Sequence, residues 1–93
     1  MSKISILIGV KIREIRKQSN INQENLALLA DIDRSYMGRI ERGEVNITVD
    51  KLYQLSSALN CSIHDLLPDD SEIKNTWTVQ VVRPHYQSSK KVV

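Results

Sequence analysis

The stretch that decides the fold runs from Gln23 to Glu44 and reads QENLALLADIDRSYMGRIERGE. It holds two short segments with apolar residues at helical spacing, separated by Asp31, Ile32 and Asp33. So short a connection cannot lay two short helices antiparallel over a useful length. We therefore expect two helices that cross at a steep angle.

The turn between these helices has a chemistry that suits such a crossing. Ile32 is its apolar middle residue and is expected to lie between the two helices. Asp31 is expected to take a positive φ, because Asp is among the few residues other than glycine that tolerate it. Gly43 follows the later of these two helices, at the position where a left-handed residue commonly ends a helix. These features predict a helix-turn-helix.

Apolar periodicity along the chain predicts five helices, the first over about residues 4–19. Pro68 ends the fifth. The N-cap residues expected for the second to fifth helices are Asn22, Asp33, Thr48 and Ser62. The residues expected to face the core are Ile4, Leu7, Ile8, Ile12, Ile15, Leu26, Leu29, Ala30, Met37, Ile40, Leu52, Leu55, Ser56, Leu59, Ile63, Leu66 and Leu67.

The character of the chain changes after Pro68. Residues 1–68 are expected to form the helical domain, and residues 69–93 a linker, a strand over 76–83 and a flexible tail. The fold class is thus all-α with a short C-terminal extended or β arm. Because a lone strand cannot stabilise itself, the arm either pairs with its copy across a dimer or packs on the helical body.

Length and composition set further bounds. At 93 residues the chain is one domain, and a formal charge of +2 does not identify a partner. Cys61 is the single cysteine, so an intrachain disulfide is impossible and an oxidising environment is not expected. No apolar run approaches a membrane span or has the pattern of a signal peptide. A cytoplasmic protein with no membrane partner is expected.

The third helix has an unusual polar side. If Met37 and Ile40 point inward, then Arg34, Ser35, Gly38 and Arg39 share the opposite side, which we call the recognition face. Small residues between two arginines let a helix sink into the DNA major groove, where arginine donates twice to guanine. The alternative is a solvated surface in which the arginines pair with acidic neighbours.

Four motifs occur in a characteristic order: IREIRK (12–17), INQENLA (21–27), DRSYMGRIERG (33–43) and TVDKLYQLSSALNCSIHDLL (48–67). Through them the chain resembles the XRE-type helix-turn-helix regulators, the family of phage repressors and Cro. DRSY and the loop residue Asn46 are similar to the small controller proteins of restriction-modification systems. Short phage repressors and antitoxin-type regulators stay open.

The resemblance implies a five-helix, repressor-like homodimer on a palindromic double-stranded DNA operator, with the third helix as recognition element. It implies a buried salt bridge between Arg16 and Glu41. The base-contacting residues would be Arg34, Ser35 and Arg39. The phosphate-binding residues would be Asn22, Gln23, Tyr36, Arg42 and Asn46, with a half-buried packing ring as the alternative for Tyr36. The dimer interface is expected to include Ile63, Leu66, Trp77, Val79 and Val81.

Two other classes of function are weighed against this one. An enzyme or metal site would draw on Cys61, His64 and Asp65, but these are too few ligands and no base-orienting pattern accompanies them. No catalytic residue, metal or cofactor is therefore expected. The second alternative is a protein-binding module whose C-terminal strand clasps a partner such as a toxin.

Overall fold

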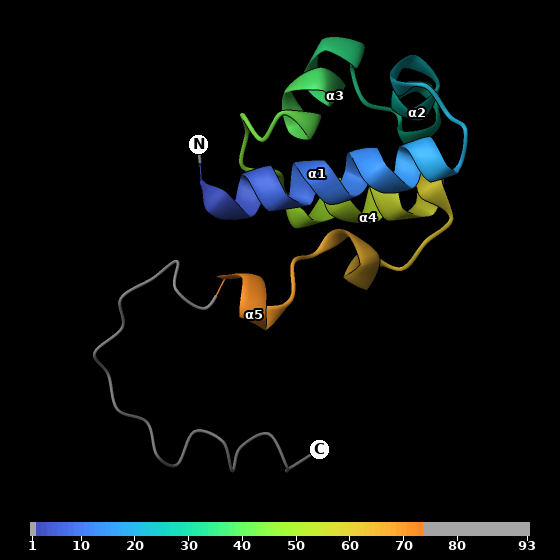
Figure 1. The fold of residues 1–93 in the computed structure, drawn as a ribbon. Helices are drawn as coiled ribbons and strands as arrows, with labels where there is room; N and C mark the ends of the chain where they lie inside the picture. Colours follow the sequence, from blue (N-terminus) through green and yellow to red (C-terminus); the bar gives the residue numbers. More distant parts are fainter. Residues whose placement is uncertain (1, 74–93) are drawn as a thin grey trace, which may run out of the picture.

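The computed structural model describes residues 2–73, and all of the secondary structure in this range is helical, as predicted. The elements are α1 (Lys3–Gln18), α2 (Gln23–Ala30), α3 (Arg34–Glu41), α4 (Val49–Leu59), the 3-10 helix η1 (Ile63–Leu66) and α5 (Asp70–Ile73). The predicted strand over 76–83, with Trp77, Val79 and Val81, lies outside the described residues. Figure 1 shows α2 and α3 on one side of α1, with η1 and α5 on the opposite side.

The predicted turn between α2 and α3 is confirmed. Asp31 ends α2 in the left-handed region with φ 57°, and Ile32 is buried. Gly43 takes φ +73° after α3, as predicted. The four predicted N-caps also hold, since the side chains of Asn22, Asp33, Thr48 and Ser62 each accept a hydrogen bond from a backbone amide in the first turn that follows.

The two helices of the helix-turn-helix share one hydrophobic core with α1, α4 and η1. The five fully buried large side chains come one each from α1, α2, α3, α4 and η1, and they are Ile12, Leu26, Met37, Leu55 and Leu66. A core shared in this way gives each short helix its stability through packing rather than through its own length. Figure 1 shows α4 alongside α1, beneath α2 and α3.

Two leucines predicted for the core lie at the surface. Leu29 is 62% exposed, because Ala27 takes the inward position on α2 and turns Leu29 toward an open hollow beside α4. Leu67 is 37% exposed, because it follows η1 in extended conformation with ψ 140°. The residue before a proline is restricted to this region, so Pro68 accounts for the second error.

The C-terminal end of the helical part also differs from expectation. The predicted fifth helix is the four-residue 3-10 helix η1, and α5 lies inside the segment predicted as a linker. The Asp69 carboxylate accepts from the Ser71 amide at 3.1 Å and so starts α5. The Lys11 ammonium lies 3.5 Å from the Glu72 carboxylate, which joins α5 to α1.

Two glycines set the separation of α1 and α3. A Cβ built on Gly9 would lie 2.5 Å from the Glu41 carbonyl oxygen and 2.6 Å from that of Ile40. A Cβ on Gly43 would lie 2.7 Å from the Ile6 Cα. Because these neighbours are backbone atoms, any side chain at either position would force α1 away from the end of α3.

Replacing Gly9 by alanine should therefore lower the free energy of unfolding, by about 1–3 kcal/mol as for other overpacked sites. The measurement is urea denaturation followed by circular dichroism. Gly38→Ala is the matched control, because its added Cβ would meet side-chain atoms rather than backbone, with Arg42 Nη1 at 3.1 Å and Gln23 Oε1 at 3.5 Å. Alanine favours a helix interior over glycine by about 1 kcal/mol, so this control should not be destabilised. Equal stability of Gly9→Ala and wild type would contradict the close approach.

Candidate nucleic-acid interface

A buried ion pair joins α1 to α3, as the sequence resemblance implied. Arg16 donates from Nε to Glu41 Oε2 at 2.6 Å and from Nη2 to Glu41 Oε1 at 3.0 Å. The Arg16 and Glu41 side chains are only 11% and 3% exposed. Arg16 Nη1 also donates to the Ile21 carbonyl at 3.0 Å, which ties down the loop before α2. The pair therefore holds two helices and a loop in one arrangement.

Gln23 extends this network to α2. Its Nε2 donates to Glu41 Oε1 at 3.1 Å, so the carboxylate at the end of α3 receives three donors from two other elements. The family resemblance implied that Gln23 binds a DNA phosphate, for which its side-chain amide hydrogens would be the donors. One of them is committed to Glu41 instead, because a buried carboxylate needs its hydrogen bonds satisfied.

Five residues of α2, α3 and the turn after α3 line one open hollow of about 430 Å³. They are Gln23, Arg34, Ser35, Gly38 and Arg42. Four of them are residues that the sequence analysis assigned to DNA contact. Two guanidinium groups beside the amino end of a helix make this hollow suitable for an anionic ligand.

The recognition face differs from its prediction at one position. Arg34, Ser35 and Arg39 are exposed, but Gly38 is buried. Arg42 Nη1 lies 3.1 Å and Gln23 Oε1 lies 3.5 Å from where its Cβ would be. The space beside Gly38 is thus covered by this chain's own side chains, and the expectation that Gly38 is exposed on the recognition face is wrong.

Glu44 contacts two of the predicted DNA-binding arginines, and the sequence analysis did not single it out. Its Oε2 accepts from Arg42 Nε at 2.6 Å, and its Oε1 lies 3.7 Å from Arg39 Nε. The hydrogen bond from Arg42 lowers the pKa of the Glu44 carboxyl and raises the pKa of the Arg42 guanidinium. Glu44 falls after the end of α3, so helical spacing rules could not have identified the pair.

Ser35 is held by the N-cap of its own helix. Its hydroxyl donates to Asp33 Oδ2 at 2.6 Å, and the same oxygen accepts from the amides of Ser35 and Tyr36. The Ser35 hydroxyl hydrogen bond, followed by the Tyr36 amide, lowers the pKa of Asp33. With its hydrogen engaged in this way, the Ser35 hydroxyl is free to accept but not to donate.

The other predicted phosphate-binding residues are not part of the lining of the hollow. Asn22 is exposed at the amino end of α2, where its Oδ1 accepts from the Asn25 amide at 2.7 Å. The Tyr36 ring is half-buried against the core, which is the packing role weighed as its alternative. Asn46 accepts from the Ser5 hydroxyl at 3.0 Å, so the loop after α3 is tied to the first turn of α1.

One residue predicted for the dimer interface, Leu66, is buried within the chain. Ile63 is half-buried, but Leu66 is 0% exposed and belongs to the core, because η1 turns it against α1 and α4. Leu66 therefore has no surface to offer a partner. Trp77, Val79 and Val81 lie outside the described residues.

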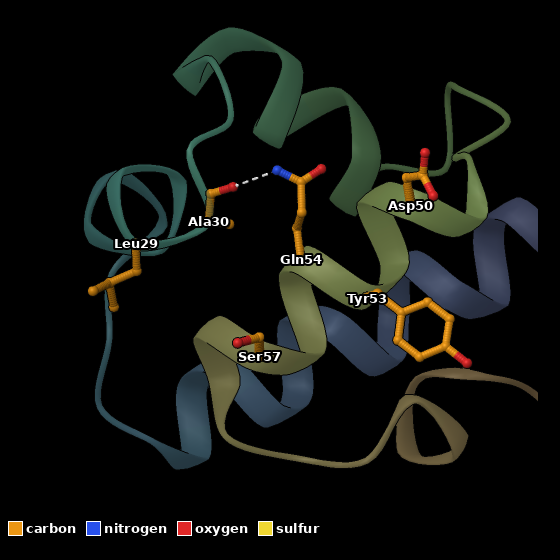
Figure 2. Close-up of a pocket in the computed structure, with 6 residues that line it drawn as sticks. All are labelled: Leu29, Ala30, Asp50, Tyr53, Gln54 and Ser57. Carbon is orange, nitrogen blue, oxygen red and sulfur yellow. Dashed lines mark hydrogen bonds between the residues drawn. The ribbon is translucent and has the colours of Figure 1, made fainter.

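A second, wider hollow lies between the end of α2 and α4. Figure 2 shows its lining, where Gln54 donates from Nε2 to the Ala30 carbonyl at 3.0 Å. Leu29 and Tyr53 stand at its edge with 62% and 57% of their surface exposed. The one charged side chain of its lining is Asp50, so this hollow carries negative charge, whereas the first hollow is lined by two arginines.

Two residues considered for enzyme or metal chemistry, Cys61 and Asp65, contribute to packing and helix capping instead. Asp65 accepts from the Ser62 amide at 3.0 Å and completes a capping box, while Cys61 is half-buried and packs against the core. Within residues 2–73, no group of three or more His, Cys, Asp or Glu side chains could hold a metal ion. None of the helices described has the length and apolar character needed to cross a bilayer.

Residues 12–66 match the helix-turn-helix family. The control protein C.BamHI of Bacillus amyloliquefaciens is 42% identical over 67 residues, which are 71% of this chain and 83% of that protein. The crystal structure of the restriction-modification controller protein C.AhdI from Aeromonas hydrophila superposes with a TM-score of 0.66 at 35% identity, over 68% of this chain and 96% of the other. The structure of the biofilm regulator SinR in complex with DNA gives 0.61 at 33% identity, over 63% and 95% of the two chains.

Breaking the ion pair on one side should strongly destabilise the fold. Arg16→Met leaves the buried Glu41 carboxylate without its main partner, and we expect a loss of about 3–5 kcal/mol in the free energy of unfolding. The double variant with Glu41→Leu should lose clearly less than the two single variants summed, since no unpaired charge remains buried. Urea denaturation of all four proteins gives the coupling. Additive losses would show that the pair is not a unit.

The N-cap of α3 should give stability a dependence on acid pH. The folded-state pKa of Asp33 lies below its ordinary value of 3.8, so its contribution is present above that value and is lost as the pH falls through the folded pKa. Asp33→Asn keeps a capping oxygen but does not titrate. Wild type should exceed this variant in stability at neutral pH, and the difference in denaturation midpoint should shrink below about pH 4. A difference that is constant with pH would contradict the assignment.

Proposed function

The chain belongs to the XRE-type helix-turn-helix family, as its motifs predicted, and on that premise we propose that it is a transcriptional regulator that binds double-stranded DNA in a sequence-specific way. The observation that carries the proposal is the exposure of Arg34, Ser35 and Arg39 on α3, beside a cationic hollow. Arg34 and Ser35 also line that hollow, so the side chains proposed for base edges adjoin those proposed for phosphates.

The dimensions of α3 suit the major groove. An α-helix with its side chains is about 10–12 Å across, which fits the roughly 12 Å width of that groove in B-form DNA. Figure 1 shows α3 on the outer side of the helical body, away from η1 and α5. Arg34 in its first turn and Arg39 in its last turn are then placed to donate to guanine O6 and N7.

Phosphate contacts would flank the recognition face on both sides. Asn22 and Gln23 lie at the amino end of α2, where free backbone amides favour an anion. Arg42 and Asn46 lie beyond the carboxyl end of α3. Contacts of this kind set the position of α3 on the duplex, and they do not distinguish between sequences.

A homodimer on a palindromic operator is the finer form of the proposal. Two copies of α3 would enter successive major grooves about 34 Å apart. Ile63 and the exposed Leu67 offer adjoining apolar surface next to η1 for the contact between copies. Likeness to C.BamHI and C.AhdI, which are named as control proteins, favours a controller of a restriction-modification system over an antitoxin-like regulator.

Selection from a random pool of DNA duplexes tests this function. The purified protein alone, at physiological salt, should enrich a palindromic sequence whose half-sites are about one helical turn apart. Enrichment of no sequence would contradict the proposal, as would enrichment that requires a second protein. Enrichment of a single half-site would support sequence-specific DNA binding and contradict the proposed homodimer.

Alanine variants should separate base contacts from phosphate contacts. Arg34→Ala and Arg39→Ala should each cost about 1–3 kcal/mol on the selected duplex and relax the preference at one base pair. Gln23→Ala should weaken binding to all sequences alike. The measurement is fluorescence anisotropy against the selected duplex and its single-base variants. Losses from the arginine variants that are uniform across sequences would remove their assignment to base edges.

A further inference from the structure

We propose that Glu44 determines specificity by holding Arg39 and Arg42 at the edge of the recognition face, so that non-specific DNA binds weakly while the cognate sequence is not disfavoured. The inference rests on the proposed DNA-binding function and assigns a role within the same site. Glu44 would act in two ways, by orienting the two arginines and by placing a negative charge beside the duplex.

Glu44 contacts fewer of the N–H donors of Arg39 than of Arg42. Glu44 Oε1 lies 3.7 Å from Nε of Arg39, and among residues 2–73 neither terminal nitrogen of that guanidinium has a hydrogen-bond partner. Arg42 gives Nε at 2.6 Å and Nη2 at 3.4 Å to the same carboxylate, which leaves chiefly Nη1. Arg39 therefore keeps the donor pair needed for guanine O6 and N7, whereas Arg42 has lost much of its capacity to bind phosphate.

The position of Arg42 is fixed from the other side as well. Its Nη1 lies 3.1 Å from where a Cβ of Gly38 would be, so its guanidinium is packed over the glycine at the edge of the hollow. The Arg42 side chain is still 60% exposed, so the pair with Glu44 is open to competition from a phosphate. Exposed pairs of this kind are weak and can be displaced.

These contacts affect the two kinds of complex differently. Non-specific binding comes almost wholly from the attraction of cations to phosphates, so a carboxylate beside two of those cations opposes it. In the cognate complex Arg39 contacts a base through its terminal nitrogens and can keep its Nε toward Glu44. Orientation of Arg39 then offsets the repulsion between Glu44 and the duplex, and the ratio of specific to non-specific affinity rises.

Glu44→Gln tests the inference, with Glu72→Gln as the matched control. Both glutamates belong to ion pairs and are similarly exposed, with 37% and 33% of the side chain accessible, but Glu72 pairs with Lys11 on the far side of α1 from α3. Each variant is titrated at several salt concentrations with the selected duplex and with an unrelated duplex. Thermal melts establish that both variants fold as wild type does.

Glu44→Gln should raise affinity for the unrelated duplex about three- to tenfold and steepen its salt dependence by about one released ion. Affinity for the selected duplex should change by less than about twofold, so the specificity ratio falls. An effect equal to that of Glu72→Gln, or the same factor on both duplexes, would overturn the inference. If wild type bound neither duplex, the proposed function itself would fail, which is a distinct result.

Discussion

The ion pair between Arg16 and Glu41 is the interaction on which the rest of the structure depends. Glu41 is the last residue of α3, and its buried carboxylate accepts two hydrogen bonds from α1 and one from Gln23 on α2. A carboxylate removed from water is tolerable only when its lone pairs are used. The three helices can satisfy it only in one mutual arrangement, and Gly9 lets α1 come close enough to do so.

That arrangement decides which side of α3 faces outward. With Glu41 and Ile40 held inward, Arg34 and Arg39 must point away from the core, and the cationic hollow forms where α2 meets α3. The same carboxylate orients Gln23 at the amino end of α2, so the proposed base and phosphate contacts share one rigid support. Glu44 acts at the outer end of this surface, where its pairs with Arg39 and Arg42 are exposed and can be exchanged for DNA.

Local chemistry could be predicted from the sequence, and exposure on a short helix could not. The caps at Asn22 and Asp33 and the positive φ of Asp31 follow from properties of those residues and their neighbours. The pattern of an eight-residue helix does not show whether Leu29 or Ala27 is buried, because burial depends on which side of α2 the other helices cover. Glu44 was missed as a partner of Arg42 because it follows the end of α3, where helical spacing no longer predicts which side chains meet.

A titration of isotope-labelled protein with the selected duplex, followed by nuclear magnetic resonance, tests the central claim most directly. If the ion pair presents α3 to DNA, the largest shift changes should fall on the amides of residues 22–25 and 34–39 and on the side-chain Nε–H groups of Arg34, Arg39 and Arg42. The Arg16 Nε–H should stay protected from exchange with solvent throughout, because it remains bonded to Glu41. Changes centred instead on Leu29 and Tyr53 beside α4, with α3 unaffected, would contradict the account.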